Sequence, residues 1–285
     1  MNILSVQSAV AYGHVGNTSA VFPLQRLGAE VWAVNTVQFS NHTGYGSWTG
    51  RVFSGAEIAE LIDGIAARGV LATCDAVLSG YLGDASVGAA IVAAVARVKA
   101  ANPRALYCCD PVIGDVGRNI YVRPDIPGFI AAQALPRADI ATPNQFELQH
   151  LTGRRITTLA EARQAVAALQ AVMADGPRTV LLTSLRTDTT PDDAIDMLAA
   201  DAAGCFLLRT PQLPIAANGA GDAVAALFLF HYLTTNSAAA ALEAAASSIF
   251  GLLRRTVEQG AGELLLVAAQ EEFVAPSRLF MADAC

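Results

Sequence analysis

The feature that most constrains the fold is the alternation of short apolar runs with longer helical segments along the whole chain. Strands that alternate with helices form βαβ units, in which a helical crossover joins two parallel strands. A parallel sheet of this kind is covered by helices on both faces. The sequence therefore predicts an α/β protein, built as a three-layer sandwich with a mostly parallel central sheet.

The expected elements have approximate bounds that follow from the apolar patterning. We expect strands near Ile3–Gln7, Val31–Val37, Ala76–Leu78, Leu106–Asp110, Ile140–Thr142, Thr179–Thr183, Ala194–Ala200 and Cys205–Arg209. We expect helices near Thr18–Leu27, Glu57–Ala67, Val87–Ala100, Leu159–Ala174, Gly219–Leu233 and Ala238–Val257. Ligands of parallel sheets bind beyond the carboxyl ends of the strands. The loops to search for chemistry are therefore Ser40–Gly50, Ile113–Pro124, Thr187–Asp193 and Pro211–Gly219.

Length and composition favour one domain over residues 1–285, because the chain is 53% hydrophobic and has no Pro/Ser-rich linker or fixed-period repeat. The net charge of −7 gives no basic field to attract nucleic acid, so nucleic acid is excluded as a partner. The sequence offers no secretion signal and no apolar run of membrane-spanning length. Its five cysteines include no CxxC pair, which favours reduced thiols and a cytoplasmic location.

The most informative motif is Asn218-Gly219-Ala220-Gly221-Asp222, which is followed at once by a long apolar run. Glycines let the backbone turn tightly, and the helix that follows directs its free N–H groups and positive dipole end at the turn. Asp222 in the first turn is placed to accept a proton from a substrate hydroxyl during phosphoryl transfer. An isolated motif of this kind also fits a simple helix cap, so the rest of the chain has to decide.

The scarcity of lysine excludes several other enzyme classes, since Lys99 is the only lysine in the chain. A P-loop enzyme needs GxxxxGK[ST], and Lys99 follows Val98. An enzyme that holds pyridoxal phosphate as a Schiff base needs a lysine in a cleft, whereas Lys99 lies near the end of an Ala-rich helical segment. A further class is disfavoured on other grounds: dinucleotide-binding oxidoreductases need GxGxxG, which the loop around Gly13 and Gly16 lacks.

The segment Gly219–Asp222 resembles the GxGD signature of ribokinase-like kinases, and other segments resemble pyridoxal kinases in particular. These segments occur in the expected order over about four fifths of the chain, and they are Ser5–Ser8, Tyr12–Asn17, Phe22–Gln25, Asn35–Tyr45, Ser79–Gly83, Cys109–Asp115 and Thr142–Glu147. The resemblance implies a ribokinase-like three-layer sandwich and ATP-dependent phosphorylation of the 5′-hydroxyl of pyridoxal, a reaction of vitamin B6 salvage. It also implies a homodimer.

The resemblance further implies roles for individual residues. Asp222 activates the hydroxyl, and Gly219, Ala220 and Gly221 supply the amides that stabilise the phosphoryl group. The vitamer-binding residues implied are Ser8, Thr43, Gly44, Tyr81 and Asp222. The ATP-binding residues implied are Asp110, Tyr121, Asn144, Glu147, Thr183, Ser184, Asn218 and Gly219. The metal-site residues implied are Asp110, Asp115, Thr142 and Glu147, for Mg²⁺ and for a monovalent cation (K⁺ or Na⁺).

One departure from the family pattern concerns phosphate binding. Many bacterial relatives carry a lysine at the position of Thr183, so here the phosphates depend on the metal, on backbone amides and on an arginine, for which Arg186 is the candidate. Two alternatives stay open: a hydroxymethylpyrimidine kinase of the same superfamily, and a noncatalytic vitamer-binding protein. ATP consumption on addition of pyridoxal separates the second alternative from a kinase.

Overall fold

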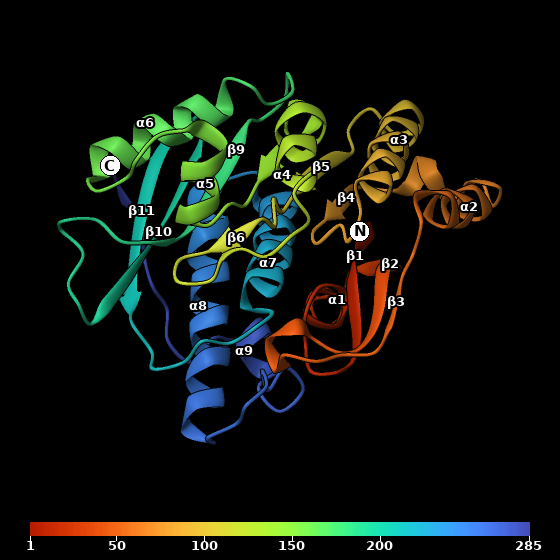
Figure 1. Cartoon of the computed structure of the whole chain (residues 1–285). Coiled ribbons are helices and arrows are strands. Elements are labelled where there is room, and N and C mark those ends of the chain that lie inside the picture. Colours follow the sequence, from red (N-terminus) through yellow and green to blue (C-terminus); the bar gives the residue numbers. More distant parts are fainter.

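The computed structural model describes residues 1–285 and centres on a ten-stranded sheet with the order β12-β11-β10-β9-β8-β5-β4-β1-β2-β3 (Figure 1). Six neighbouring strands from β9 to β2 are parallel, whereas β10, β11 and β12 at one edge and β3 at the other pair antiparallel. A separate two-stranded hairpin is formed by β6 and β7. The expected α/β architecture with a mostly parallel sheet is confirmed.

The strands have the following bounds: β1 Asn2–Tyr12, β2 Glu30–Asn41, β3 Gly50–Val52, β4 Ala76–Ser79, β5 Leu106–Cys109, β6 Gly114–Asp115, β7 Asn119–Ile120, β8 Ile140–Ala141, β9 Thr179–Leu185, β10 Ala194–Asp201, β11 Gly204–Pro211 and β12 Asp283–Ala284. The α-helices are α1 Asn17–Arg26, α2 Gly55–Ala66, α3 Ala85–Ala101, α4 Ile126–Phe129, α5 Gln145–Thr152, α6 Leu159–Gln170, α7 Ala220–Thr235, α8 Ala238–Glu258 and α9 Glu271–Val274.

Helices cover both faces of the sheet and bury a separate apolar core on each (Figure 1). One core lies between the sheet and α2, α3, α4, α5 and α6. The other lies between the sheet and α1, α7, α8 and α9. Helix α7 is apolar on nearly all sides because it is enclosed by the sheet, α1 and α8. The three-layer prediction is therefore confirmed.

Most helix starts are fixed by local sequence. Helices α2, α5 and α6 each begin with a capping box, in which a cap side chain and a glutamate three residues later satisfy each other's backbone amides. Asp84 and Ser237 cap α3 and α8 in a simpler way. Helix α7 differs, because its N-cap is Gly219 and no side chain caps its first amides.

The structure contains short elements that the sequence did not predict. Strand β2 runs on to Asn41 and pairs with β3 after a one-turn helix at Thr43–Tyr45, within the segment expected to be a loop. The loop expected at Ile113–Pro124 contains the β6–β7 hairpin. Two-residue and three-residue strands carry too little periodicity to be recognised from sequence. No helix of the structure is both long enough and apolar enough to cross a membrane.

The parallel strands all direct their carboxyl ends toward one edge of the sheet, and the residues predicted to be functional lie there. Ser8 lies in the second half of β1, Asp110 directly follows β5, and Thr142 follows β8. Tyr81 comes two residues after β4, and Thr183 lies near the end of β9. The fold therefore brings together polar residues that are far apart in sequence.

Candidate active site

A cavity of about 780 Å³ opens at this edge of the sheet. With the exception of Arg186, the residues with a role predicted from the sequence line it: Ser8, Thr43, Gly44, Tyr81, Asp110, Asp115, Tyr121, Thr142, Asn144, Glu147, Thr183, Ser184, Asn218, Gly219, Ala220, Gly221 and Asp222. The volume falls in the range of pockets that bind ligands such as cofactors. The shared cavity is a finding, while the ligand that each residue contacts stays a prediction.

The turn before α7 is held in place by close backbone packing at Gly219. This residue has φ of 83°, and a Cβ atom there would lie 1.8 Å from the carbonyl oxygen of His14. The Ser19 hydroxyl donates a hydrogen bond of 2.8 Å to the Gly219 carbonyl oxygen. Only glycine fits this position, so the turn places the start of α7 firmly against the loop that follows β1.

The first amides of α7 are free to bind an anion. The first helical hydrogen bond runs from the Ala223 N–H to the Gly219 carbonyl at 3.0 Å. The N–H groups of Ala220 and Gly221 come earlier in the turn and have no intrahelical acceptor. With no capping side chain and the positive end of the helix dipole at this point, the turn has the properties of a phosphate site.

Asp222 is buried against the protein except where it faces the cavity, and burial raises its pKa to about 6. The backbone N–H groups of Gly16 and of Asp222 itself donate to the carboxylate and oppose this rise. A carboxylate with this pKa is mostly ionised at neutral pH, yet it is a stronger base than an exposed aspartate. Asp222 thus has the properties of a general base.

A second group of carboxylates lies beside Asp222. Asp110 is buried, and burial, the charge of Glu147 and the charge of Asp222 raise its pKa well above the usual range. The Thr142 hydroxyl donates a hydrogen bond of 2.9 Å to Asp110 Oδ1 and opposes the rise only in part. Like charges held this close need a counter-ion. The donor set therefore suits a hard cation such as Mg²⁺.

Both carboxylate oxygens of Glu147 accept hydrogen bonds from backbone N–H groups. Its Oε1 accepts from the N–H groups of Ile113 at 2.9 Å and Gly114 at 3.4 Å, and its Oε2 accepts from the Asn144 N–H at 2.9 Å. Burial nevertheless raises its pKa to about 8, because it outweighs those three bonds. Asn144 is likewise engaged, since Oδ1 caps α5 and Nδ2 donates to Gly114 at 2.8 Å. Both residues shape the cavity wall.

No three acidic, histidine or cysteine side chains are grouped closely enough to enclose a metal ion. Asp115 lines the cavity but its Oδ1 accepts from the Val116 N–H at 2.7 Å. Mg²⁺ at kinase sites is bound by one or two carboxylates together with substrate phosphates and water. Asp110, with Thr142 beside it, is the part of the predicted set that fits this kind of shared site.

The end of β9 offers two hydroxyls to the cavity. Thr183 is buried, and its N–H donates to the Pro143 carbonyl at 3.0 Å. Ser184 is exposed and has φ of 53°, a left-handed conformation that is uncommon for a residue with a side chain. Such conformations cluster where ligands bind. The Thr183–Ser184 pair therefore stays the predicted phosphate contact at this strand.

The β6–β7 hairpin contributes a cationic residue that the sequence analysis missed. Arg118 lines the cavity, and its Nη1 donates a hydrogen bond of 2.7 Å to Asn218 Oδ1. The predicted candidate, Arg186, lies outside the cavity and donates to the Asp192 carbonyl at 3.2 Å. The structure therefore places Arg118, and not Arg186, at the cavity wall, while the phosphate contact itself stays a prediction. The sequence could have suggested Arg118, because it lies between Asp115 and Tyr121, two residues with predicted roles in the site.

Tyr121 follows the same hairpin and lies over the carboxylates. Burial raises the pKa of its phenol, and the charges of Glu147, Asp110, Asp222 and Asp115 raise it further. The side chain is nevertheless 47% exposed, so it covers the cavity at its edge. The contact between Tyr121 and ATP stays a prediction.

The vitamer-binding residues predicted from sequence line the same cavity. Ser8 is buried. Tyr81 is partly buried, and its own burial raises the pKa of its phenol. Thr43 begins the one-turn helix that follows β2 and is exposed, as is Gly44. Val37 and Phe39 of β2 add an apolar surface to this cavity. An apolar wall with a few hydroxyls suits a small aromatic alcohol.

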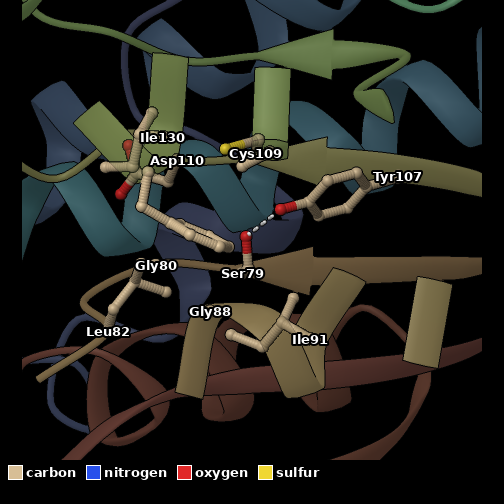
Figure 2. A pocket seen from close by; sticks show the side chains of 11 residues that line it. Ser79, Gly80, Leu82, Gly88, Ile91, Tyr107, Cys109, Asp110 and Ile130 are labelled. Carbon is tan, nitrogen blue, oxygen red and sulfur yellow. Dashed lines mark hydrogen bonds between the residues drawn. The ribbon is translucent and has the colours of Figure 1, made fainter. Parts of the chain in front are cut away.

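A second, small pocket is lined in part by Asp110, which also lines the main cavity (Figure 2). Figure 2 shows Ser79 and Tyr107 side by side, and their hydroxyls are 2.8 Å apart in a hydrogen bond. The other side chains that line it include Leu82, Ile91 and Ile130, which are apolar. Because its two hydroxyls satisfy each other, we interpret this pocket as a packing gap.

Comparisons with known proteins agree with this geometry. A family model described as phosphomethylpyrimidine kinase matches residues 56–266. The chain is 62% identical over 286 residues to a pyridoxal kinase PdxY of Granulibacter bethesdensis, covering 100% of both chains. It is 58% identical over 285 residues to a pyridoxal kinase PdxY of Deinococcus radiodurans, covering 99% of this chain and 96% of that one.

Solved structures give the same result. A pyridoxal kinase from Leishmania donovani in complex with ADP and pyridoxine superimposes with a TM-score of 0.90 and 29% identity, covering 100% of this chain and 99% of that one. The same enzyme in complex with ADP and ginkgotoxin gives a TM-score of 0.91 at 28% identity, with the same coverage. The similarity thus extends over the whole chain and includes both the sheet and the cavity edge.

Proposed function

This chain belongs to the pyridoxal kinase family, and on that premise we propose that it transfers the γ-phosphoryl group of ATP to the 5′-hydroxyl of pyridoxal, giving pyridoxal 5′-phosphate and ADP. The observation that carries the proposal is the position of Asp222. It lies in the first turn of an uncapped helix, at a cavity that also contains the Thr183–Ser184 hydroxyls and the apolar wall near Ser8.

The reaction follows from the groups around the α7 turn. The Asp222 carboxylate accepts the proton of the 5′-hydroxyl, and the freed oxygen forms a bond to the γ-phosphorus as the bond to the β-phosphate oxygen breaks. The N–H groups of Ala220 and Gly221 hold the charge of the phosphoryl group during this transfer. Because these amides are fixed before the reaction by the packing at Gly219, little reorganisation is needed.

The polyphosphate occupies the end of the cavity near β9 and the β6–β7 hairpin. Thr183 and Ser184 donate hydroxyl hydrogen bonds to it, and Arg118 adds the positive charge that a lysine supplies in many relatives. Bound Mg²⁺ supplies neutralisation of the phosphate charge, and Asp110, assisted by Thr142, is the residue that holds it. A monovalent cation site, if occupied by K⁺ or Na⁺, lies near Thr142 by the same proposal.

The vitamer occupies the opposite end. Its ring packs against Val37, Phe39 and Tyr81, and Ser8 and Thr43 provide hydrogen bonds to its polar substituents. The flap, residues 42–49 between β2 and β3, carries Thr43, closes over the vitamer and excludes water, which protects the transferred group from hydrolysis. Residues 1–285 act as one catalytic domain in this scheme, and the enzyme works as a homodimer in the cytoplasm.

A second candidate is phosphorylation of a hydroxymethylpyrimidine, because the matching family model is described as a phosphomethylpyrimidine kinase. Both substrates are small aromatic alcohols, and both reactions use the same base and anion site. Assaying ADP release with pyridoxal, pyridoxine, pyridoxamine and hydroxymethylpyrimidine, each with and without Mg²⁺, tests the proposal. We expect the highest kcat/KM with a B6 vitamer. Turnover with hydroxymethylpyrimidine alone would overturn the proposed substrate.

A further inference from the structure

Glu263 lies far from the catalytic turn in sequence but contacts both loops that enclose the vitamer end of the cavity. One loop is residues 13–16, which follow β1, and the other is the flap, residues 42–49 between β2 and β3. Glu263 Oε1 lies 2.9 Å from His42 Nε2 and accepts a hydrogen bond of 2.6 Å from the Tyr45 hydroxyl. Its Oε2 accepts from the His14 N–H at 3.2 Å.

The carboxylate fits between these loops with little spare room. Its side chain is only 16% exposed. A Cβ atom at Gly13, where φ is 90°, would lie 2.6 Å from Glu263 Oε2. Partial burial raises the pKa of Glu263, but the hydrogen bonds from Tyr45 and His42 outweigh it, and the pKa lies below its ordinary value. A charged acceptor with three donors is a strong and directional connection.

This contact also fixes the orientation of His42, which itself lines the cavity. A carboxylate accepts only, so His42 Nε2 carries the hydrogen that lies between the two residues. The other ring nitrogen, Nδ1, is buried and has no hydrogen-bond partner. The ring also stacks on Tyr45 with centroids 4.6 Å apart. Glu263 therefore selects the tautomer of neutral His42 in which Nδ1 is left as a free acceptor.

We propose that Glu263 is a positioning residue for vitamer binding, which holds the flap against the loop after β1 and orients His42 toward the cavity. It does not touch the reacting atoms. Its effect reaches the substrate through His42 and through Thr43, which follows His42 directly in the flap. This inference rests on the proposed function, since it names the residue that organises the vitamer side of that same site.

The kinetic test compares Glu263→Ala and Glu263→Gln with a control, Glu271→Gln. Glu271 lies in the same C-terminal region and is 76% exposed in an ion pair with Arg26. We expect Glu263→Ala to raise KM for pyridoxal about tenfold, equivalent to ~1.4 kcal/mol, with KM for ATP unchanged. Glu263→Gln keeps an acceptor for His42 and Tyr45 and should recover part of the loss. Glu271→Gln should behave as wild type.

A spectroscopic test separates positioning from simple stabilisation of the fold. The ¹⁵N chemical shifts of the His42 ring report which nitrogen carries the hydrogen. We expect the Nε2–H tautomer in the wild type and in Glu271→Gln, and a mixture of tautomers in Glu263→Ala. If Glu263→Ala lowers the melting temperature but leaves KM for pyridoxal and the His42 tautomer unchanged, the inference is wrong.

Two further measurements keep the outcome interpretable. If Glu263→Ala does not fold, Tyr45→Phe is the alternative variant, because it removes a single donor to Glu263. It should raise KM for pyridoxal by a smaller factor and leave KM for ATP unchanged. No change in KM for pyridoxal would count against the inference. Wild-type turnover of pyridoxal is measured first. Its absence would refute the proposed function, whereas the tautomer in the unliganded protein tests the role of Glu263 independently of activity.

Discussion

Replacing Asp222 with asparagine should remove activity and stabilise the protein at the same time. Asparagine has nearly the same shape and keeps an oxygen that can accept the Gly16 N–H, but it cannot take up a proton. General bases contribute about 10²–10⁴-fold to rate. We therefore expect kcat to fall by about 10³-fold, with KM for pyridoxal and ATP little changed.

The expected gain in stability comes from the pKa of Asp222, which burial raises from 3.8 to about 6. The native state then binds more protons than the unfolded state between these two values, so wild-type stability decreases as the pH rises through that window. A shift of this size corresponds to at most ~3 kcal/mol. Because the side chain also faces the cavity, we expect about 1–2 kcal/mol after allowance for solvent.

The assay is thermal unfolding of both proteins between pH 4 and pH 8. At pH 7.5 the asparagine variant should melt roughly 2–5 °C above the wild type. The difference should vanish near pH 4, where Asp222 is protonated. Asp175→Asn is the matched control, because Asp175 is fully exposed beside Arg178 and its replacement should give no pH-dependent difference.

Two results would refute the reasoning, and they bear on different parts of it. A variant that keeps wild-type kcat would show that Asp222 is not the base. A melting-temperature difference that is equal at pH 4 and pH 7.5 would show that its burial does not destabilise the charged form. The pH dependence of kcat/KM in the wild type gives an independent check, since activity should decline as the pH falls below about 6.

Three other predictions concern the phosphate end of the site and the α7 turn. Arg118→Ala should raise KM for ATP about tenfold through loss of a charge-assisted contact, with KM for pyridoxal unchanged in steady-state assays; equal effects on both would argue against a phosphate contact. Gly219→Ala should lower both the melting temperature and kcat, because the added Cβ atom would clash with His14. Gly221→Ala has open space around its Cβ position and should leave the melting temperature unchanged. Similar losses of melting temperature in both variants would contradict the packing argument. Chelation of Mg²⁺ with EDTA should abolish ADP release and its re-addition should restore it, so persistent turnover in EDTA would exclude a metal-dependent transfer.

Much of the site was predictable because its chemistry is local in sequence. The motif around Gly219 contains the turn, the free amides and Asp222 within a few residues, and each property follows from backbone geometry. The positions of Asp110, Thr142 and Thr183 at the carboxyl ends of strands were also predictable. The parallel sheet then requires strand ends to meet, so these residues reached one cavity without knowledge of the strand order.

The sequence by itself determined the α/β architecture, because alternating strand and helix patterns leave few ways to bury their apolar faces. It also determined the α7 turn. Only the tertiary structure decided which arginine lines the cavity, since local sequence does not distinguish Arg118 from Arg186. The same holds for Glu263, whose partners His14, His42 and Tyr45 lie more than 200 residues away. Contacts of such separation arise from chain packing, which no local pattern records.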